Sequence, residues 1–179
     1  MRFTNTLRVA EHLRHLDILA ILQDVEIEIL WTLGRFDEAR SHYARAQALK
    51  PDYADAHLAQ AVALQRQGRN EDAVLLYRRT LALHPGYVDA WSNLGTICYY
   101  QADYAQAMHC QQQALALAGD NPARLNNLAM ACLAALQPEQ AEHALRRALA
   151  MPAAPAVCRF NLAVALLMQG RYAEAWPYY

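Results

Sequence analysis

Residues 88–121 read VDAWSNLGTICYYQADYAQAMHCQQQALALAGDN, and this stretch of 34 residues decides the fold. Small and large apolar residues recur in it at intervals of three and four, first from Trp91 to Cys98 and then from Tyr104 to Ala114. Such spacing is typical of amphipathic helices. The stretch therefore predicts two helices joined by a short turn.

The same pattern repeats along the chain with a period of 34 residues. An alanine occupies the twentieth position of all five repeats, which begin at residues 20, 54, 88, 122 and 156. Small residues also recur in most repeats at the eighth and twenty-seventh positions, where they let two helix backbones approach closely. We expect about 4.5 repeats, because the fifth is incomplete. The five alanines are Ala39, Ala73, Ala107, Ala141 and Ala175.

Glycine marks the turn inside three of the repeats, at the fifteenth position. Gly34, Gly68 and Gly170 stand there, and glycine permits the backbone conformation that a tight turn between helices needs. The fourth repeat has Leu136 at this position and Pro138 two residues later. We expect this departure to weaken the fourth repeat without changing the fold.

This pattern resembles the tetratricopeptide repeat family, and the resemblance covers residues 20–179. The third repeat carries it best, and Pro51 and Pro85 match the proline that closes a repeat. The resemblance implies an all-α, right-handed α-solenoid of antiparallel helix pairs whose first helices line a concave, protein-binding face. The matching residues of the third repeat are Trp91, Leu94, Gly95, Tyr104, Ala107 and Ala114.

Composition and charge exclude several classes of protein. The chain has 55% hydrophobic and 18% charged residues, which argues against disorder, and its net charge of -1 provides no basic field for nucleic acid or anionic lipid. Charged residues interrupt the first 22 positions, so the sequence predicts neither a signal peptide nor a membrane span there. We expect a cytoplasmic protein. Residues 1–19 fall outside the period and predict one amphipathic helix that caps the array.

A row of asparagines is the main candidate for function. Asn93, Asn127 and Asn161 occupy the sixth position of the last three repeats, which lies on the concave face if the resemblance holds. Repeats advance by about 10 Å and an extended peptide rises about 3.3 Å per residue, so each amide would meet roughly every third peptide residue. An amide can both donate to and accept from a peptide backbone. We expect all three amides to lack side-chain partners in the free protein.

Polar and amphipathic residues beside this row complete the candidate peptide-binding site, and the row is similar to the asparagine ladder of O-linked N-acetylglucosamine transferases. Asparagine is also simply common at this exposed position in the family, so the row has a second, purely structural interpretation. The neighbouring candidates are Ser92, Asn126, Thr96, Met130, Tyr99 and Tyr100.

The charged residues narrow the choice of ligand. A clamp for a peptide carboxylate needs Lys or Arg at the second, fifth or sixth position of a repeat, and none stands there. The third repeat contains Asp89, Asp103 and Asp120 but no Lys or Arg. This pattern favours a basic or neutral ligand over an acidic one.

No motif predicts catalysis, a cofactor or a metal. His12 and His15 lie three residues apart, but no suitable further ligand follows them, and a solvated pair is the simpler interpretation. Four cysteines lie in apolar, alanine-rich surroundings without a CxxC pair, which predicts reduced thiols in the core. They are Cys98, Cys110, Cys132 and Cys158.

The last ten residues, GRYAEAWPYY, support two further hypotheses. They are similar to the final repeat of bacterial proteins in which the array continues into a glycosyltransferase domain, which would make this chain an acceptor-recognition domain. The incomplete fifth repeat also predicts that Leu162, Leu166, Tyr172 and Trp176 lack a covering helix. Self-association through this end is therefore a third hypothesis, besides a scaffold that binds an unidentified protein or peptide.

Overall fold

The computed structural model describes residue 30, residue 35, residue 38 and residues 41–42, 54–152 and 154–179. These residues belong to two compact units, divided between Pro85 and Gly86. Over these described ranges the regular secondary structure consists of helices alone, with no strand, which confirms the all-α, helix-pair solenoid. None of these helices is long and apolar enough to cross a membrane. The expected capping helix, residues 1–19, lies outside the described residues.

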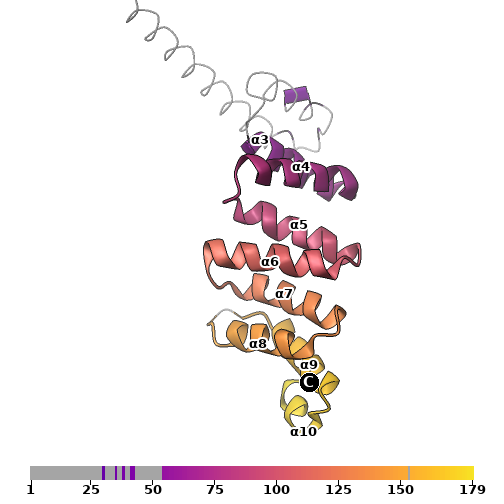
Figure 1. Cartoon of the computed structure of the whole chain (residues 1–179), viewed down its shortest axis with the longest axis vertical. Helices are drawn as coiled ribbons and strands as arrows, with labels where there is room; N and C mark the ends of the chain where they lie inside the picture. Colours follow the sequence, from indigo (N-terminus) through magenta and orange to yellow (C-terminus); the bar gives the residue numbers. More distant parts are fainter. Residues whose placement is uncertain (1–29, 31–34, 36–37, 39–40, 43–53, 153) are drawn as a thin grey trace, which may run out of the picture. The chain divides into compact units, whose positions relative to one another are not determined.

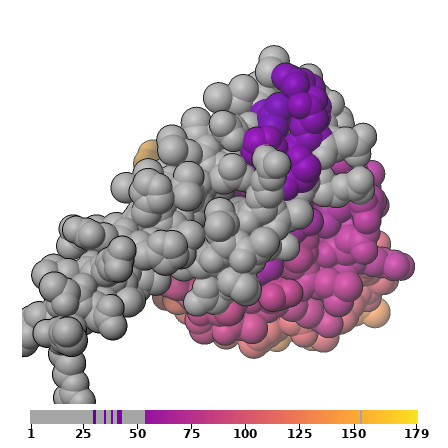
Figure 2. Space-filling view, turned by 90° about the horizontal axis from the view of Figure 1, so that it is seen from above, coloured from indigo at the N-terminus to yellow at the C-terminus, as the bar shows by residue number. Residues whose placement is uncertain are grey.

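The described part of the first unit contains one helix pair, α3 (Ala54–Arg66) and α4 (Asn70–Leu83). The pair packs through alanines that are fully buried, Ala61 on α3 and Ala73 on α4. Tyr77 on α4 is also fully buried, and its hydroxyl donates to Oε1 of Gln65 on α3 at 2.6 Å. Figure 2 shows the described residues of this unit in indigo and magenta.

The second unit contains the remaining helices, and each of them packs against the next one along the chain (Figure 1). A short 3-10 helix, η1 (Trp176–Tyr178), follows the last of them. The helices are α5 (Val88–Tyr100), α6 (Tyr104–Ala118), α7 (Pro122–Ala134), α8 (Pro138–Leu149), α9 (Val157–Met168) and α10 (Tyr172–Ala175).

A single type of turn recurs at the end of each first helix. In this turn one residue, such as Ala102, has a left-handed backbone conformation. The backbone N–H of the next residue donates to the carbonyl five residues before it, as in the bond from Asp103 to Cys98 at 2.9 Å. This is the Schellman pattern of helix termination. The same bond joins residues 35 and 30, 69 and 64, 137 and 132, and 171 and 166, so it repeats with the period of the sequence.

The backbone at the fifteenth position is left-handed even where glycine is absent. Ala102 has a φ of 62° and Leu136 a φ of 57°, close to the 77° of Gly68 and the 73° of Gly170. Left-handed backbone strains a residue that has a Cβ by about 1 to 2 kcal/mol. The third and fourth repeats therefore keep the turn at a local cost.

Small residues bring the helices of each pair into backbone contact. Ala107 on α6 is 1% exposed. A Cβ placed on Gly95 of α5 would lie 3.0 Å from the Cβ of Cys110 and 3.2 Å from the carbonyl oxygen of Ala107. Both distances are tighter than nearly all real Cβ contacts, so a larger residue at position 95 would require α5 and α6 to move apart by a few tenths of an ångström.

The second unit curves toward the side of its first helices. Helices α5 and α7 contact each other directly, and so do α7 and α9. On the opposite side a cavity of about 530 Å³ opens between α6 and α8, with Leu128 and Cys132 of α7 among its lining residues. Helices that meet on one side and diverge on the other make the first side concave. The face of α5, α7 and α9 is therefore the inner face of this unit.

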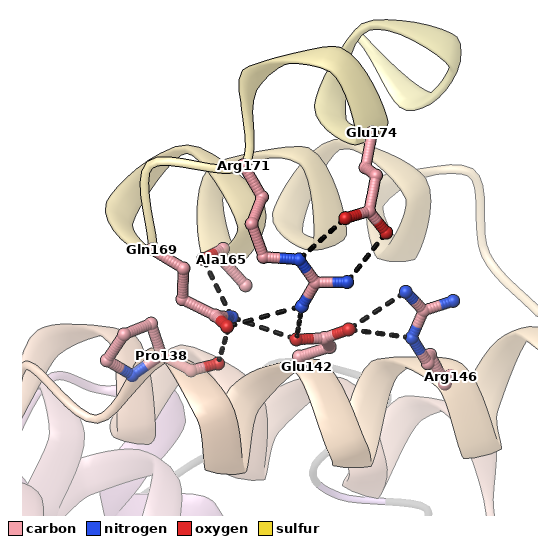
Figure 3. Close-up of polar contacts among 7 residues, drawn as sticks. All are labelled: Pro138, Glu142, Arg146, Ala165, Gln169, Arg171 and Glu174. Atoms are coloured by element: carbon pink, nitrogen blue, oxygen red, sulfur yellow. Dashed lines mark hydrogen bonds and ion pairs between the residues drawn. The ribbon is translucent and has the colours of Figure 1, made fainter.

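An ion-pair network around a partly buried carboxylate joins α8 to the last helices (Figure 3). The Glu142 side chain is 13% exposed, and its Oε2 accepts from Gln169 Nε2 at 2.9 Å and from Arg171 Nη1 at 2.7 Å. Its Oε1 accepts from Arg146 Nε at 2.8 Å, and Arg171 also forms a double hydrogen bond with Glu174. Burial opposes ionisation of Glu142, but the hydrogen bonds and the Arg171 charge outweigh it and lower its pKa.

The close helix contact generates the first prediction. Ala107→Leu adds three carbons where two backbones nearly touch, and such overpacking costs about 1 to 3 kcal/mol. We expect the melting temperature, followed by circular dichroism, to fall by several degrees. Gln112→Leu is the matched control, because Gln112 is exposed on the same helix. Equal melting temperatures for the two variants would contradict the helix contact described above.

The Glu142 network generates the second prediction. A carboxyl group whose pKa is lowered by folding stabilises the fold above its unfolded pKa, and this contribution is lost as the pH falls through the folded value. Glu142→Gln is therefore expected to lower the free energy of unfolding at pH 7 by about 1.5 to 3 kcal/mol, the range for hydrogen bonds to charged groups. Urea unfolding from neutral to acidic pH should show the difference between variant and parent shrinking.

Glu139→Gln is the control for this experiment, since Glu139 is an exposed carboxyl group on the same helix. It should change the free energy of unfolding little at any pH. A Glu142→Gln effect that stays constant down to the acid range would mean that packing, and not charge, is responsible.

Candidate functional site

The three asparagines of the row lie on the first helices of the second unit, but they are not equivalent. Asn93 on α5, Asn127 on α7 and Asn161 on α9 are all half-buried. The side-chain amides of Asn93 and Asn127 have no hydrogen-bond partner among the described residues. These two amides are available to a ligand.

The expectation that all three amides lack partners is wrong for Asn161. Its Nδ2 donates to Oδ1 of Asn126 at 2.8 Å. Asn126 is only 7% exposed, and its own Nδ2 contacts Met130 Sδ at 3.5 Å. The two asparagines join α7 to α9, so they stabilise the contact between repeats. Asn126 consequently offers little surface to a peptide.

Five of the predicted site residues come together around one small cavity. The cavity has a volume of about 70 Å³ and lies between α5 and α7. The rings of Tyr99 and Tyr100 meet edge to face at 5.5 Å. Ser92 and Asn93 do not line it. The lining residues on these two helices are Gly95, Thr96, Tyr99, Tyr100, Asn127 and Met130.

Sequence reasoning missed two residues of this cavity, Gly95 on α5, which it assigned to helix packing alone, and Gln111 on α6. Gln111 is 1% exposed, and its Nε2 donates to the main-chain carbonyl of Ser92 at 3.0 Å. Its Oε1 is buried and accepts no hydrogen bond from the described residues. Such an unpaired acceptor costs about 1 to 3 kcal/mol.

Comparing residues at intervals of 34 could have drawn attention to Gln111. The residues one repeat before and after it are Tyr77 and Leu145, both fully buried. The tyrosine hydroxyl is paired with Gln65, and the leucine has no polar group to satisfy. The glutamine therefore differs from both neighbours, because one end of its side-chain amide is buried without a partner.

The carboxylates of the third repeat are not free. Asp120 forms an ion pair with Arg147, and Asp103 accepts from the backbone N–H of Gln106 at the start of α6. Asp89 lies 3.6 Å from Arg124, although its side chain is 76% exposed and such a pair is weak. These three residues therefore give little support to a preference for basic ligands.

All four cysteines are free and buried, as the sequence analysis expected. Burial raises the pKa of the Cys132 thiol to about 11 and also raises the pKa of Cys158. These thiols therefore stay protonated at neutral pH and are poor nucleophiles and metal ligands. In the part of the chain that the structure describes, no three His, Cys, Asp or Glu side chains are grouped to hold a metal. His12 and His15 lie outside that part.

Two further surfaces of the second unit could contact a partner. The cavity of about 530 Å³ on the outer face combines apolar Leu115 with polar Gln140 and His143. At the last helices, Tyr179 contacts Phe160 and Trp176, and these three rings are 49% to 75% exposed. The sequence predicted that four apolar residues of the fifth repeat lack a covering helix. This prediction is met only in part, because Tyr172 and Trp176 are exposed whereas Leu162 and Leu166 are buried.

Solved structures with the same fold were found over most of the chain. The crystal structure of MamA superposes with a TM-score of 0.82 at 18% identity, covering 89% of this chain and 87% of that one. PilF of Pseudomonas aeruginosa gives 0.76 at 23% identity, with 92% and 75% covered. YrrB, described as a tetratricopeptide protein with an unusual peptide-binding site, gives 0.69 at 21% identity, with 76% and 70% covered. No curated protein sequence matches this chain.

The family is established at the level of sequence as well. The tetratricopeptide repeat model matches residues 26–88, 58–122 and 126–179, which together span most of the chain. The period of 34 residues, the recurring Schellman turns and the antiparallel helix pairs agree with this match. The chain belongs to the tetratricopeptide repeat family.

Proposed function

We propose that this chain is a protein-interaction scaffold that binds an extended peptide, or an extended segment of a protein, along the face of α5 and α7. The observation that carries the proposal is the pair of unpartnered amides, Asn93 on α5 and Asn127 on α7, of which Asn127 lines a cavity together with two tyrosines. A backbone amide unit can bond to both groups of an asparagine side chain whatever the sequence of the peptide. The function needs no cofactor and no catalytic group.

The hydrogen bonds of the two asparagines are too weak to hold a peptide alone. A net hydrogen bond contributes about 1 kcal/mol, so two asparagines give at best millimolar binding. Tyr99 and Tyr100 supply apolar area with a polar end, which suits a peptide groove. We therefore expect the amides to set the path of the backbone and the aromatic side chains to provide most of the affinity.

The chemistry around this face supports a neutral ligand. None of the residues that line the small cavity is charged. A buried charge without a partner is costly, so a peptide that places Lys, Arg, Asp or Glu in the cavity should bind poorly. Four buried, free thiols support a reducing compartment such as the cytoplasm for this scaffold.

The third prediction concerns the asparagine pair. Asn127→Ala should weaken a bound peptide about fivefold, the equivalent of one net hydrogen bond, and Asn93→Ala should act roughly independently. Both residues are half-buried and unpaired, so the free energy of unfolding should change by less than about 0.5 kcal/mol. Calorimetric titration with peptides from a pull-down partner, and urea unfolding, measure the two effects separately.

Gln140→Ala is the matched control, because it removes an amide from the outer face. It should leave peptide affinity unchanged. If Gln140→Ala weakens binding and the two asparagine variants do not, the peptide binds between α6 and α8 and the proposal for the inner face is wrong. Asn161→Ala is unsuitable for this purpose, since it breaks the bond to Asn126.

A second candidate function uses the same face. The asparagine row and the last ten residues are the basis for an acceptor-recognition domain of a larger glycosyltransferase, in which the peptide would be the acceptor. Peptide binding by Asn93 and Asn127 is common to both candidates. Whether the natural reading frame continues past Tyr179 into a transferase domain distinguishes them.

The third candidate is self-association through the aromatic cluster of Phe160, Trp176 and Tyr179. Exposed aromatic rings that touch one another form an apolar patch, and such patches favour contact with a second protein surface. The three rings are 49%, 68% and 75% exposed. This observation is independent of the inner face, so both functions can coexist.

The fourth prediction tests the aromatic cluster. Sedimentation velocity at rising protein concentration should show a reversible dimer, and the double variant Trp176→Ala, Tyr179→Ala should stay monomeric. Tyr100→Ala, which removes an aromatic ring that is 77% exposed elsewhere, should dimerise like the parent. A parent protein that remains monomeric throughout would refute self-association through this end.

A further inference from the structure

The two asparagines without side-chain partners occupy the same position of adjacent repeats. Asn93 on α5 and Asn127 on α7 are half-buried and lie 34 residues apart in the sequence. Asn127 lines the small cavity between the two helices, as do Thr96 and Tyr100. Thr96 and Tyr100 follow Asn93 by three and seven residues, so these three residues share one side of α5. Both amides therefore face the surface that the peptide is proposed to cross.

The distance between the two helices sets the spacing of the amides. Helices α5 and α7 contact each other directly. The axes of helices in contact lie about 8 to 10 Å apart. A peptide that crosses both helices therefore meets an asparagine amide twice, at an interval of about 8 to 10 Å.

This interval distinguishes between two extended conformations of the peptide. In a β-strand the groups that point to one side recur every second residue, at intervals of about 6.7 Å and then about 13 Å, and neither matches. A polyproline II helix has three residues per turn and rises about 3.1 Å per residue, so groups on one side recur about every 9.3 Å. Two equivalent asparagines therefore match one turn of polyproline II.

The bonds that the asparagines can form also suit this conformation. A polyproline II backbone has no internal hydrogen bonds, so its carbonyls are open to a donor. The side-chain NH2 of an asparagine can donate to such a carbonyl even where the next peptide residue is proline, which has no backbone N–H. Asn93 and Asn127 can thus bind carbonyls that lie three residues apart in the peptide.

The small cavity has the walls and the size that a proline ring needs. Tyr99 and Tyr100 line it, and their ring planes meet at 75° with centroids 5.5 Å apart. Tyr99 also contacts the ring of Tyr104 at 5.9 Å, which holds it in place. A volume of about 70 Å³ admits only a few non-hydrogen atoms, and no lining residue is charged. A proline side chain has three carbons and no polar group, and aromatic-lined grooves commonly bind polyproline II segments.

The weakness of the hydrogen bonds favours a ligand that is already in its bound conformation. Two asparagines give little affinity, so the ordering of a flexible peptide would offset much of it. A proline-rich segment adopts polyproline II before it binds, and it therefore loses less conformational freedom.

We infer that the face of α5 and α7 binds a proline-containing segment in the polyproline II conformation, with Asn93 and Asn127 donating to carbonyls one turn apart and a proline ring between Tyr99 and Tyr100. The inference rests on the proposed binding of a peptide to this face. It adds a backbone conformation and a preferred residue type to that proposal.

The test uses three labelled peptides of ten residues with the intact chain. The first is deca-L-proline, the second is deca-D-proline, which has the same composition and the opposite handedness, and the third is a flexible alternating Ala-Ser peptide. Fluorescence polarisation should show that the parent binds deca-L-proline at least about tenfold more tightly than either control, because only the left-handed helix presents its carbonyls at the right spacing and direction.

Two variants locate the binding site. Asn127→Ala and Tyr100→Ala should each weaken binding of deca-L-proline about fivefold, since one removes a net hydrogen bond and the other removes a wall of the cavity. Tyr100 is 77% exposed, so its loss should leave the melting temperature nearly unchanged. Tyr172→Ala is the matched control, because it removes a tyrosine ring that is 63% exposed on α10. It should bind deca-L-proline as the parent does.

The possible failures separate this inference from the proposed function. Equal binding of the L and D peptides, or no binding of either, would overturn the inference, while Asn127-dependent binding of other neutral peptides would leave the proposed function intact. A preference for deca-L-proline that neither Asn127→Ala nor Tyr100→Ala reduces would place the peptide elsewhere and also overturn it. A chain that binds no peptide of any kind would overturn the proposed function and the inference together.

Discussion

The close approach of two helix backbones at positions with almost no side chain is the contact on which the rest of this structure depends. At Gly95 a methyl group would contact Cys110 and Ala107 more tightly than nearly all real Cβ atoms contact their neighbours. Because α5 and α6 are so close there, a side chain on α6 can reach a carbonyl of α5, as Gln111 does with Ser92. The position of the Gln111 side chain is thus a direct result of helix packing.

The turn between the helices is fixed by backbone hydrogen bonds and not by the identity of one residue. Glycine predicts the left-handed turn correctly at Gly68 and Gly170, but Ala102 and Leu136 adopt it as well. The bond from Asp103 to Cys98 and its equivalents satisfy carbonyls that the end of a helix leaves open. The same bond forms in five turns, including the two that have alanine or leucine in place of glycine, so the period predicts this turn better than residue type does.

The sequence predicts the helix pairs and part of the site, because both depend on residues that recur at a fixed spacing. The cluster of Thr96, Tyr99, Tyr100, Asn127 and Met130 follows from their positions on two first helices of adjacent repeats. The bond between Asn126 and Asn161 could not be predicted in this way. This bond joins the fifth residue of one repeat to the sixth residue of the next. Comparing the same position in successive repeats cannot reveal a contact between two different positions.

Gln111 shows a second limit of predicting a site from the repeated pattern. A glutamine at helical spacing fits an amphipathic pattern and attracts no notice, although its equivalents Tyr77 and Leu145 are both buried. Only the structure shows that one end of its amide is paired and the other is not. The repeat that resembles the family most closely at its packing positions therefore holds a buried polar group that packing does not require. In a chain built from one repeated contact, a departure of this kind identifies a side chain that the repeated contact does not account for.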